Sequence, residues 1–243
     1  MKIISSQRTC KTKQLVRELI PDWAKPKSIL LNLGDSSINE REYSGYKIIN
    51  RVENIRNCSN KIRMFEIFNE NGIKAVTYVP IRRSDYGNLN LMRFKMKFRG
   101  KELVFRRGKE LKVIPIEQVS VRDMNYYDFA TIKEDKEKEY RIIIYKDKIV
   151  RAMIKINETG DFQFKQENCR FVTMDFSKFP QSVKDNLFKA VKVLGIDLCG
   201  IDLLKNTDGE FKILEINSGM SLSERSIEEF FNLLKEEVRN NSL

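Results

Sequence analysis

One short segment near the end of the sequence, residues 200–217, constrains the fold more than any other part of the chain. Its centre is Asp208-Gly209, a dipeptide that favours a two-residue type I′ turn because both turn positions need positive φ. Apolar and polar residues alternate on both sides, so we expect an antiparallel hairpin in which Thr207 faces Glu210. In this register the apolar face consists of two pairs, Ile201 with Ile216 and Leu203 with Leu214.

The opposite face of the predicted hairpin places Asp202 directly across from Glu215, with Asn217 two residues further along. Side chains paired in this way have Cβ atoms about 4.5–5.5 Å apart, and two like charges there destabilise a sheet. A divalent cation between the carboxylates reverses the sign of the interaction. Oxygen ligands from Asp, Glu and Asn suit Mg²⁺, especially when phosphate oxygens complete the coordination. Two alternatives stay open: a solvated hairpin, or a four-residue loop that sets Asp202 opposite Ile213.

The absence of histidine limits the chemistry further. Without histidine, Ser-His-Asp and Cys-His nucleophiles and His-liganded zinc are excluded. The four cysteines are dispersed and form no CxxC pair. The net charge of +11 favours an anionic partner, such as nucleotide phosphates, an acidic substrate or nucleic acid, although surface lysines without a specific role would give the same balance. No apolar run approaches the roughly 20 residues that span a bilayer. The first residues also lack an apolar signal segment, so we expect a cytoplasmic protein with no membrane segment.

Periodicity along the chain predicts an α+β fold with antiparallel sheets. Residues 1–49 have a β-α-β pattern and are followed by two helices, over 50–56 and 60–71. Strands over 139–145 and 149–156 predict a hairpin, and a helix beginning near Pro180 should end at Gly195. An amphipathic helix over 224–238 closes the chain. We expect no internal repeat.

A basic stretch over residues 92–99 is predicted to be a half-buried strand. Methionine and phenylalanine alternate there with lysine and arginine, which gives one cationic face: Arg93, Lys95, Lys97 and Arg99. Simple solvent exposure of these side chains is the alternative to a phosphate-binding role.

The C-terminal pattern resembles the signature of ATP-grasp ligases. The resemblance rests on Ala190-Val191, Leu194-Gly195-Ile196-Asp197, Gly200-Ile201-Asp202 and Leu214-Glu215-Ile216-Asn217-Ser218. It is closest to the branch of glutathione synthetase, the ribosomal-protein glutamate ligase and phage-encoded ATP-grasp proteins. Upstream, Glu139-Tyr140-Arg141, the strand that ends in Lys155, and the segments Asn50-Arg51 and Asn60-Lys61 are similar to further family motifs.

The resemblance implies a small α/β domain over 1–49, an ATP-grasp N-terminal lobe over 50–122 and a C-terminal lobe over 123–243, two α+β lobes with antiparallel sheets that grip ATP. It implies ATP and Mg²⁺ as cofactors, with the metal held by Asp202, Glu215 and Asn217. The implied catalytic cations are Arg141, Arg151 and Lys155. The implied nucleotide-binding residues are Arg93, Lys95, Tyr126, Tyr127 and Glu139, although both tyrosines could equally be sheet aromatics.

The implied activity is ATP-dependent ligation of a carboxylate to an amine through an acyl phosphate, with an amino acid or peptide as a substrate. The sequence departs from the family in a glycine-poor phosphate loop, where Gly100 is the only glycine between Arg93 and Val104, and in Gly219-Met220 after Asn217. Two rivals therefore stay open: an ATP-grasp protein that binds nucleotide without ligating, and a basic nucleic-acid-binding protein. The substrates and the oligomeric state are left open.

Overall fold

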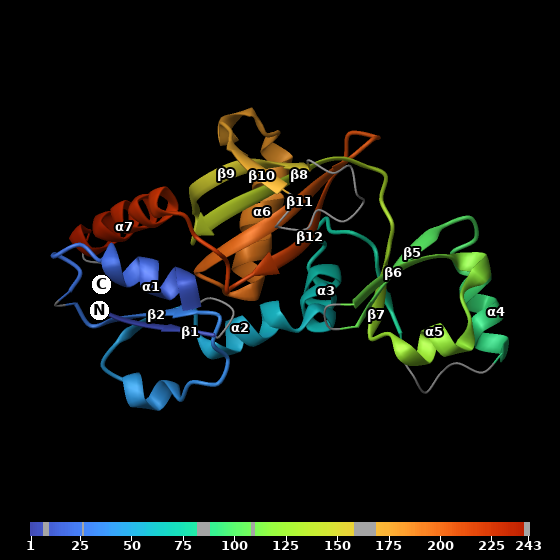
Figure 1. Cartoon of the computed structure of the whole chain (residues 1–243), viewed down its shortest axis with the longest axis horizontal. Coiled ribbons are helices and arrows are strands. Elements are labelled where there is room, and N and C mark those ends of the chain that lie inside the picture. Colours follow the sequence, from blue (N-terminus) through green and yellow to red (C-terminus); the bar gives the residue numbers. More distant parts are fainter. Residues whose placement is uncertain (7–9, 26, 82–87, 108–109, 158–168, 241–243) are drawn as a thin grey trace.

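The computed structural model describes residues 1–6, 10–25, 27–81, 88–107, 110–157 and 169–240. Three β-sheets form the framework (Figure 1). A three-stranded N-terminal sheet lies at one end of the molecule and a four-stranded middle sheet at the other. A five-stranded sheet built from the C-terminal part of the chain lies between them. The mixed architecture with two antiparallel sheets confirms the predicted fold class.

The N-terminal sheet is parallel, in the order β1-β2-β3, as the predicted β-α-β pattern requires. Its elements are β1 (Lys2–Ser5), α1 (Cys10–Glu18), β2 (Ile29–Leu33) and β3 (Lys47–Ile49), with a 3₁₀ turn over Glu40–Tyr43. All five residues of β2 are buried, which is typical of a parallel strand covered on both faces.

Two helices connect this unit to the rest of the chain: α2 (Val52–Ser59) and α3 (Lys61–Glu70). The side chain of Asn60 accepts a hydrogen bond from the Arg63 amide and so caps the start of α3. Ile55 and Cys58 of α2 and the buried side chains of α3 belong to the same apolar core as one face of the five-stranded sheet. Lys61, the first residue of α3, is thereby held beside that sheet.

The middle sheet has the order β4-β7-β5-β6 and is antiparallel. Its elements are β4 (Tyr78–Pro80), α4 (Asn88–Lys97), β5 (Glu102–Arg107), β6 (Glu110–Pro115), a 3₁₀ turn (Ile116–Gln118), α5 (Val121–Tyr126) and β7 (Phe129–Ile132). Because β7 lies inside this sheet, the sheet extends beyond residue 122. We call the part of the chain that contains this sheet the middle lobe, and we propose that the boundary between the lobes lies just after Ile132.

The prediction of a strand over residues 92–99 is wrong, because this segment forms helix α4. Phe94 is buried, and Leu91 and Phe98 pack against the same core. Their spacing of three and four residues is that of one helix face. Met92 and Met96, which a strand would have placed on the same face as Phe94, are instead 64% and 71% exposed.

The five-stranded sheet has the order β10-β9-β8-β11-β12 and is antiparallel. Its elements are β8 (Lys136–Tyr145), β9 (Lys148–Asn157), β10 (Cys169–Thr173), β11 (Leu198–Asn206) and β12 (Phe211–Asn217), together with a 3₁₀ turn (Phe176–Lys178), α6 (Gln181–Leu194) and α7 (Glu224–Arg239). The predicted hairpin of β8 and β9 and the helix that ends at Gly195, which has φ 67°, are confirmed.

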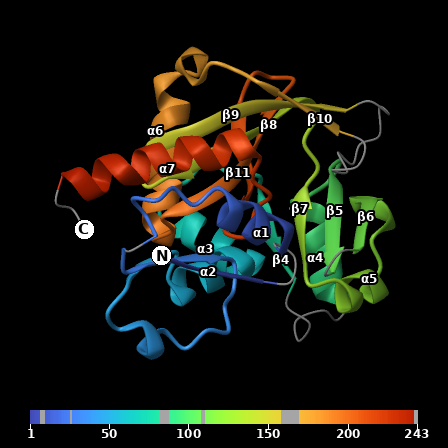
Figure 2. The same ribbon diagram turned by 60° about the vertical axis from the view of Figure 1, so that its left-hand side comes forward.

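The two faces of this sheet differ. One face is apolar and packs with α2, α3 and α6. At one end of the other face, Ile143, Tyr145 and Leu198 pack under α7 (Figure 2). The rest of that face carries charged side chains from β8, β9, β11 and β12. This polar half of the sheet forms the floor of the candidate site.

The C-terminal hairpin closes through a different turn from the one predicted. Lys205 pairs with Phe211, and the Asn206 amide donates to the Glu210 carbonyl, so the loop has three residues and the register is shifted by one. A β-bulge at Leu214 then restores the register, and Leu203 pairs with Ile213 instead of Leu214. Asp202 consequently lies opposite Glu215, and Ile201 opposite Ile216, as predicted.

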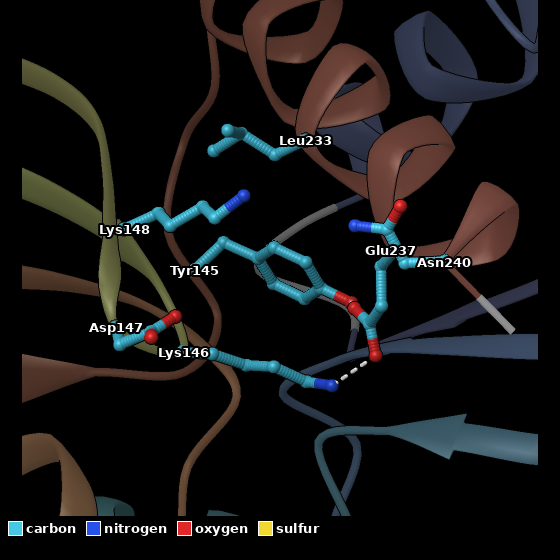
Figure 3. A pocket seen from close by; sticks show the side chains of 7 residues that line it. All are labelled: Tyr145, Lys146, Asp147, Lys148, Leu233, Glu237 and Asn240. Carbon is cyan, nitrogen blue, oxygen red and sulfur yellow. Dashed lines mark hydrogen bonds and ion pairs between the residues drawn. The ribbon is translucent and has the colours of Figure 1, made fainter. Parts of the chain in front are cut away.

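The N-terminal unit is joined to the C-terminal sheet by polar contacts. Glu237 of α7 accepts hydrogen bonds from the Tyr145 hydroxyl and from Lys146 (Figure 3). It accepts a third from Lys47 of β3. A pocket of about 290 Å³ lies beside this carboxylate. The buried Asn50 amide group also bonds both to Asn32 and to Leu198 across the junction. Within the described ranges, no helix has the length and apolar character needed to cross a bilayer.

Candidate functional site

Asp202 lies at the centre of the polar face, on the strand between β8 and β12. Its cross-strand neighbours are Arg141 on one side and Glu215 on the other. The Arg141 guanidinium donates two hydrogen bonds to the Asp202 carboxylate, from Nε at 2.5 Å and from a terminal nitrogen at 2.9 Å. Asp202 is only 5% exposed, so this bidentate ion pair is largely shielded from water.

Glu215 and Asn217 lie beside Asp202 and are held by one another and by Lys61. The Asn217 amide donates to Glu215 at 2.8 Å. The Lys61 ammonium lies 3.5 Å from Glu215 and donates to the Ile216 carbonyl at 3.1 Å and to the Asn217 oxygen at 3.5 Å. Lys61 therefore supplies positive charge at the rim of the same group of oxygen atoms.

The two carboxylates have pKa values that are moved in opposite directions. Burial raises the pKa of Asp202 to about 6, because the attraction of Arg141 only partly offsets the loss of water and Glu215 adds repulsion. Burial also opposes ionisation of Glu215, but Lys61, the Asn217 hydrogen bond and Arg106 outweigh it and lower the pKa of Glu215 to about 2. In the metal-free protein, Glu215 thus carries the more stable negative charge.

The donor set suits a hard divalent cation. Asp202, Glu215 and the Asn217 carbonyl offer only oxygen atoms, and each carboxylate oxygen that accepts one hydrogen bond still has a second lone pair. No group of three His, Cys, Asp or Glu side chains that could hold a metal occurs within the described residues. Two carboxylates and one amide therefore leave coordination positions that phosphate oxygens and water would complete, as Mg²⁺ commonly requires.

Glu139 and Lys155 form a second ion pair on the same face, one step further along the strands. Lys155 donates to Glu139 at 2.7 Å, and Lys136 donates to its other oxygen at 2.9 Å. Glu139 is 4% exposed and Lys155 9% exposed. Glu139 also lies close enough to Arg141 to raise the pKa of that guanidinium further. The structure therefore brings the predicted residues Glu139, Arg141 and Lys155 together with the proposed metal ligands.

Arg151 lies on the same face but is used differently. Its guanidinium donates to Ser223 Oγ at 3.0 Å and to Thr173 Oγ1 at 2.6 Å. Ser223 is the residue that caps the start of α7. These contacts tie β9 to β10 and α7, and they engage the guanidinium of Arg151 with hydroxyl groups instead of with Asp202. Its predicted catalytic role is therefore the least supported of the three cations.

The structure places Arg93 and Lys95, which were predicted to bind phosphate, on helix α4. Helix α4 covers the outer face of the middle sheet, through the core that Phe94 shares with Leu103 and Phe105 of β5 (Figure 1). Lys95 donates to the Glu117 carbonyl at 2.8 Å. Both residues consequently lie across the middle sheet from the polar face of the five-stranded sheet.

Arg106 is the cation from the middle lobe that sequence reasoning missed. It alternates with Leu103 and Phe105 along β5 and so lies on the opposite face of the strand from the α4 core. Its charge contributes to the lowered pKa of Glu215, which places it near that carboxylate. A two-residue alternation was the signal that could have identified Arg106. Leu103, Phe105 and Arg107 lie on one face of the strand, and Val104 and Arg106 lie on the other.

Tyr126 and Tyr127, predicted near the adenine, both contact Glu110 of β6. The Tyr126 hydroxyl donates to Glu110 at 2.8 Å and the Tyr127 hydroxyl at 3.4 Å. Tyr127 is 4% exposed inside the core of the middle lobe, so it is not available to stack on a base. Tyr126 is 40% exposed, and the guanidinium of Arg107 lies 4.4 Å from the centre of its ring. Tyr127 therefore packs as a core aromatic beside Phe105 of β5.

Two glycines allow the chain to pack closely around the site. Gly34, at the end of β2, has φ 83°, and a Cβ atom there would lie 2.8 Å from the Cα atom of Gly219. This approach brings the N-terminal unit directly against the loop after Asn217. A Cβ atom at Gly200 would lie 2.9 Å from the sulfur of Met220 and 3.4 Å from Arg141 Cδ. Gly200 thus leaves the space in which Arg141 reaches Asp202.

Comparison with known proteins gives consistent matches. Residues 116–237, half of the chain, match the RimK-like ATP-grasp domain family. The chain is 25% identical over 192 residues to N-acetylaspartylglutamate synthase A of Mus musculus, covering 74% of this chain and 49% of that protein. It is 26% identical over 196 residues to beta-citrylglutamate synthase B of Homo sapiens, covering 74% and 48%. The chain thus spans about half the length of these curated relatives.

Solved structures show a similar fold. The crystal structure of a D-alanine–D-alanine ligase from Bacillus anthracis in complex with ATP superposes with a TM-score of 0.65, at 13% identity, and covers 97% of both chains. This match spans all three sheets and supports the arrangement of lobes around the polar face.

Proposed function

This chain belongs to the RimK-like ATP-grasp family, and on that premise we propose that it is an ATP-dependent ligase that joins a carboxylate to an amine. The observation that carries the proposal is the position of Asp202, paired with Arg141 on one strand and with Glu215 on the other. Oxygen atoms that could bind a metal and a fixed cation therefore share one face of the sheet. Transfer of a phosphoryl group depends mainly on such positioned charges.

Asp202, Glu215 and Asn217 would hold Mg²⁺ together with the ATP phosphates. When bound, the ion would neutralise negative charge on the phosphate oxygens that leave and are transferred. Glu215 is suited to this role because its lowered pKa keeps it ionised at neutral pH. Asp202, with its pKa near 6, is mostly ionised at neutral pH, and a cation bound beside it would lower this pKa further.

Four cations surround these oxygen ligands. Arg141 is fixed by its bidentate contact and would orient the reacting carboxylate and phosphate. Lys61 and Arg106 approach Glu215 from α3 and from the middle sheet. Lys155 is held by Glu139. Because these side chains come from both lobes, ATP bound between the sheets would be neutralised from two sides.

The proposed reaction has two steps. A carboxylate oxygen of the substrate attacks the γ-phosphorus, and the bond between that phosphorus and the β–γ bridging oxygen breaks to release ADP. The amine nitrogen then attacks the acyl carbon of the acyl phosphate, and phosphate leaves with the oxygen that came from the carboxylate. The amine loses one proton to phosphate or solvent. No histidine is required for either step.

We propose an amino acid as one substrate, with L-glutamate as the first amine to test. The names of two relatives, N-acetylaspartylglutamate synthase and beta-citrylglutamate synthase, describe products that contain glutamate. The carboxylate substrate would enter beside the N-terminal unit, where Gly34 meets Gly219. We also propose a cytoplasmic location, since buried free thiols at Cys58 and Cys199 suit a reducing compartment that supplies ATP and Mg²⁺.

Thermal unfolding tests the proposed Mg-ATP site. ATP with Mg²⁺ should raise the melting temperature of the wild-type protein, because a ligand that binds only the folded state stabilises it. Asp202→Asn and Glu215→Gln should abolish the shift. Glu228→Gln, the same change at an exposed carboxylate of α7, is the matched control and should retain it. Equal shifts in all four proteins would refute the site.

Isotope transfer tests the ligase activity. With the carboxylate substrate labelled with ¹⁸O and glutamate as the amine, the released phosphate should carry one ¹⁸O atom, measured by mass spectrometry. Magnesium-dependent ATP binding without ADP formation, across a panel of carboxylates and amines, would instead support the alternative of a nucleotide-binding protein that does not ligate.

A further inference from the structure

The outward face of helix α4 combines exposed methionines with unpaired positive charge. Met92 and Met96 lie one turn apart and are 64% and 71% exposed. They are two of the four large hydrophobic side chains that are exposed in the described part of the chain. Arg93 and Lys97 follow them at the same spacing and are also exposed. These four side chains form a continuous stripe, which we call the α4 surface.

The methionines are not needed to anchor the helix. Leu91, Phe94 and Phe98 face the core of the middle lobe and already supply an apolar stripe. The rings of Phe94 and Phe98 lie 5.0 Å apart on that inner side. An exposed pair of unbranched apolar side chains on the opposite side of the same helix therefore has no partner in the fold that accounts for it.

The charge of the α4 surface is also uncompensated. Residues 88–101 contain five Lys and Arg side chains and no Asp or Glu. Within the described chain, no carboxylate lies within ion-pair distance of Arg93, Lys97 or Arg99. Lys95 differs, because its ammonium turns toward the end of β6 and donates to the Glu117 carbonyl. The two charges that flank the methionines therefore meet no carboxylate, although the Lys97 ammonium lies 5.3 Å from the centre of the Phe98 ring.

This surface lies outside the candidate nucleotide site. Helix α4 is at the end of the molecule, and the middle sheet separates it from the five-stranded sheet (Figures 1 and 2). The cation that the middle lobe presents to Glu215 is Arg106, from the opposite face of β5. A nucleotide bound between the lobes would therefore lie across the middle sheet from the charges of α4.

We propose that the α4 surface is a docking site for an acidic peptide segment of a partner protein, with an apolar side chain that covers Met92 and Met96. Methionine adapts its shape to different apolar partners and, together with arginine, is enriched in protein interfaces. Carboxylates on the partner would pair with Arg93 and Lys97 and would speed and orient docking. Nucleic acid fits this surface less well, because the aromatic rings of α4 face inward and offer no base-stacking platform.

Selection from a phage-displayed library of random peptides tests the proposal whatever the identity of the partner. The library is selected on the wild-type protein and depleted on a charge-reversed variant, Arg93→Glu with Lys97→Glu. We expect enriched sequences that combine Asp or Glu with a Leu, Ile or Phe. Fluorescence anisotropy then measures binding of a labelled synthetic peptide with the enriched sequence, beside a version in which every acidic residue is replaced by its amide.

The expected affinities separate the contribution of the two charges from that of the two methionines. The charge-reversed variant should bind the acidic peptide at least about tenfold more weakly, and Met92→Ser with Met96→Ser at least about fivefold more weakly. The matched control, Lys189→Glu with Lys192→Glu on the exposed side of α6, makes the same change in net charge and should stay within about twofold of wild type. Thermal melting would verify that each variant is folded.

Three results would overturn the proposal. One is a library that yields no peptide whose binding depends on these four α4 residues. Another is equal binding of the acidic peptide and its amide version. The third is a single-stranded oligonucleotide that binds more tightly than any selected peptide, with an affinity that the charge reversal lowers and the serine substitutions do not. This result would assign the surface to nucleic acid. Each readout is independent of ATP turnover and of the proposed ligase activity.

Discussion

Replacing Arg141 with glutamine would remove the positive partner of a buried carboxylate at the centre of the candidate site. Asp202 is 5% exposed and accepts both guanidinium hydrogen bonds of Arg141. Glutamine keeps much of the side-chain length and a hydrogen-bond donor but removes the charge. The variant therefore tests whether Asp202 is a desolvated anion that depends on a cation, as the proposed metal site requires.

The expected loss of stability follows from the burial of this pair. Removing one partner of a buried ion pair costs about 3–5 kcal/mol, because the remaining charge is left without compensation. Since the Arg141 side chain is 20% exposed and Glu215 is 34% exposed, water reaches one side of the site. We therefore expect the lower end of the range, a loss of about 3 kcal/mol near pH 8 without metal or nucleotide.

The loss should depend on pH with a definite sign. The pKa of Asp202 in the folded protein is about 6, above its ordinary value of 3.8, so the folded state binds the proton more tightly than the unfolded state. The contribution of this group to the free energy of unfolding is therefore greatest below pH 4 and falls as the pH rises through about 6. Without Arg141 the folded pKa rises further, so the fall becomes larger and extends to higher pH.

Urea unfolding in the presence of EDTA, followed by circular dichroism, measures these differences. The deficit of Arg141→Gln relative to wild type should shrink between about pH 8 and about pH 5, where the Asp202 carboxyl is protonated. Adding Asp202→Asn to the variant should restore at least half of the loss near pH 8. As a control, Arg225→Gln, which breaks an exposed ion pair with Glu229, should cost less than about 1 kcal/mol.

Two outcomes would refute this reasoning. If Arg141→Gln lost the same free energy at both pH values, the Asp202 charge would not be the source of the loss. If the second substitution gave no recovery, the loss would come from packing of the arginine side chain. Either result would remove the physical basis for a cation requirement at Asp202.

The other predictions concern the junction that positions the N-terminal unit. Gly34→Ala should lower the free energy of unfolding by more than about 1 kcal/mol in urea titrations, because alanine disfavours a positive φ and its Cβ would clash with Gly219. Asn50→Ala should cost about 3 kcal/mol in the same assay, since its buried amide group bonds both sides of the junction; a loss below about 1 kcal/mol would contradict this role. Although burial opposes it, hydrogen bonds from Lys146, Lys47 and Tyr145 lower the pKa of Glu237 to about 2. The ionised Glu237 therefore stabilises the wild-type protein above pH 4.5, and this contribution is lost as the pH falls toward 2. In Glu237→Gln the melting temperature should change less across that pH interval than in wild type.

In the C-terminal hairpin, the local sequence indicates the position of the turn, but further contacts set the loop length and the register. Asp208-Gly209 correctly predicted a turn, but the loop has three residues instead of two because the Asn206 side chain accepts a hydrogen bond from the Glu210 amide. The bulge at Leu214 then compensates for the shifted register. Asp202 and Glu215 were predicted as a pair from a turn geometry that the protein does not adopt, and the bulge that restores the pair carried no recognised sequence signal.

Helix α4 shows the limit of short periodic patterns. Residues 92–99 alternate apolar and basic side chains as a strand would, yet Leu91, Phe94 and Phe98 also match one face of a helix. A stretch of this length satisfies both periods, and packing of the phenylalanines against β5 decides between them. The predicted phosphate-binding roles of Arg93 and Lys95 assumed a strand in this segment, and Arg106 on the following strand was overlooked.

The sequence by itself determined the elements whose signals are local: the β-α-β start, the helix that ends at Gly195, the hairpin of β8 and β9, and the carboxylate and amide groups on one face of the last hairpin, which are the proposed metal ligands. Only the tertiary structure decided which cations reach those ligands. Lys61, Arg106 and Arg141 come from a helix, from the middle sheet and from a neighbouring strand, so no spacing along the chain encodes their meeting. The tertiary structure also decided the ionisation of the two carboxylates. The pKa values of Asp202 and Glu215 diverge only when both are buried from water and these cations lie close to them.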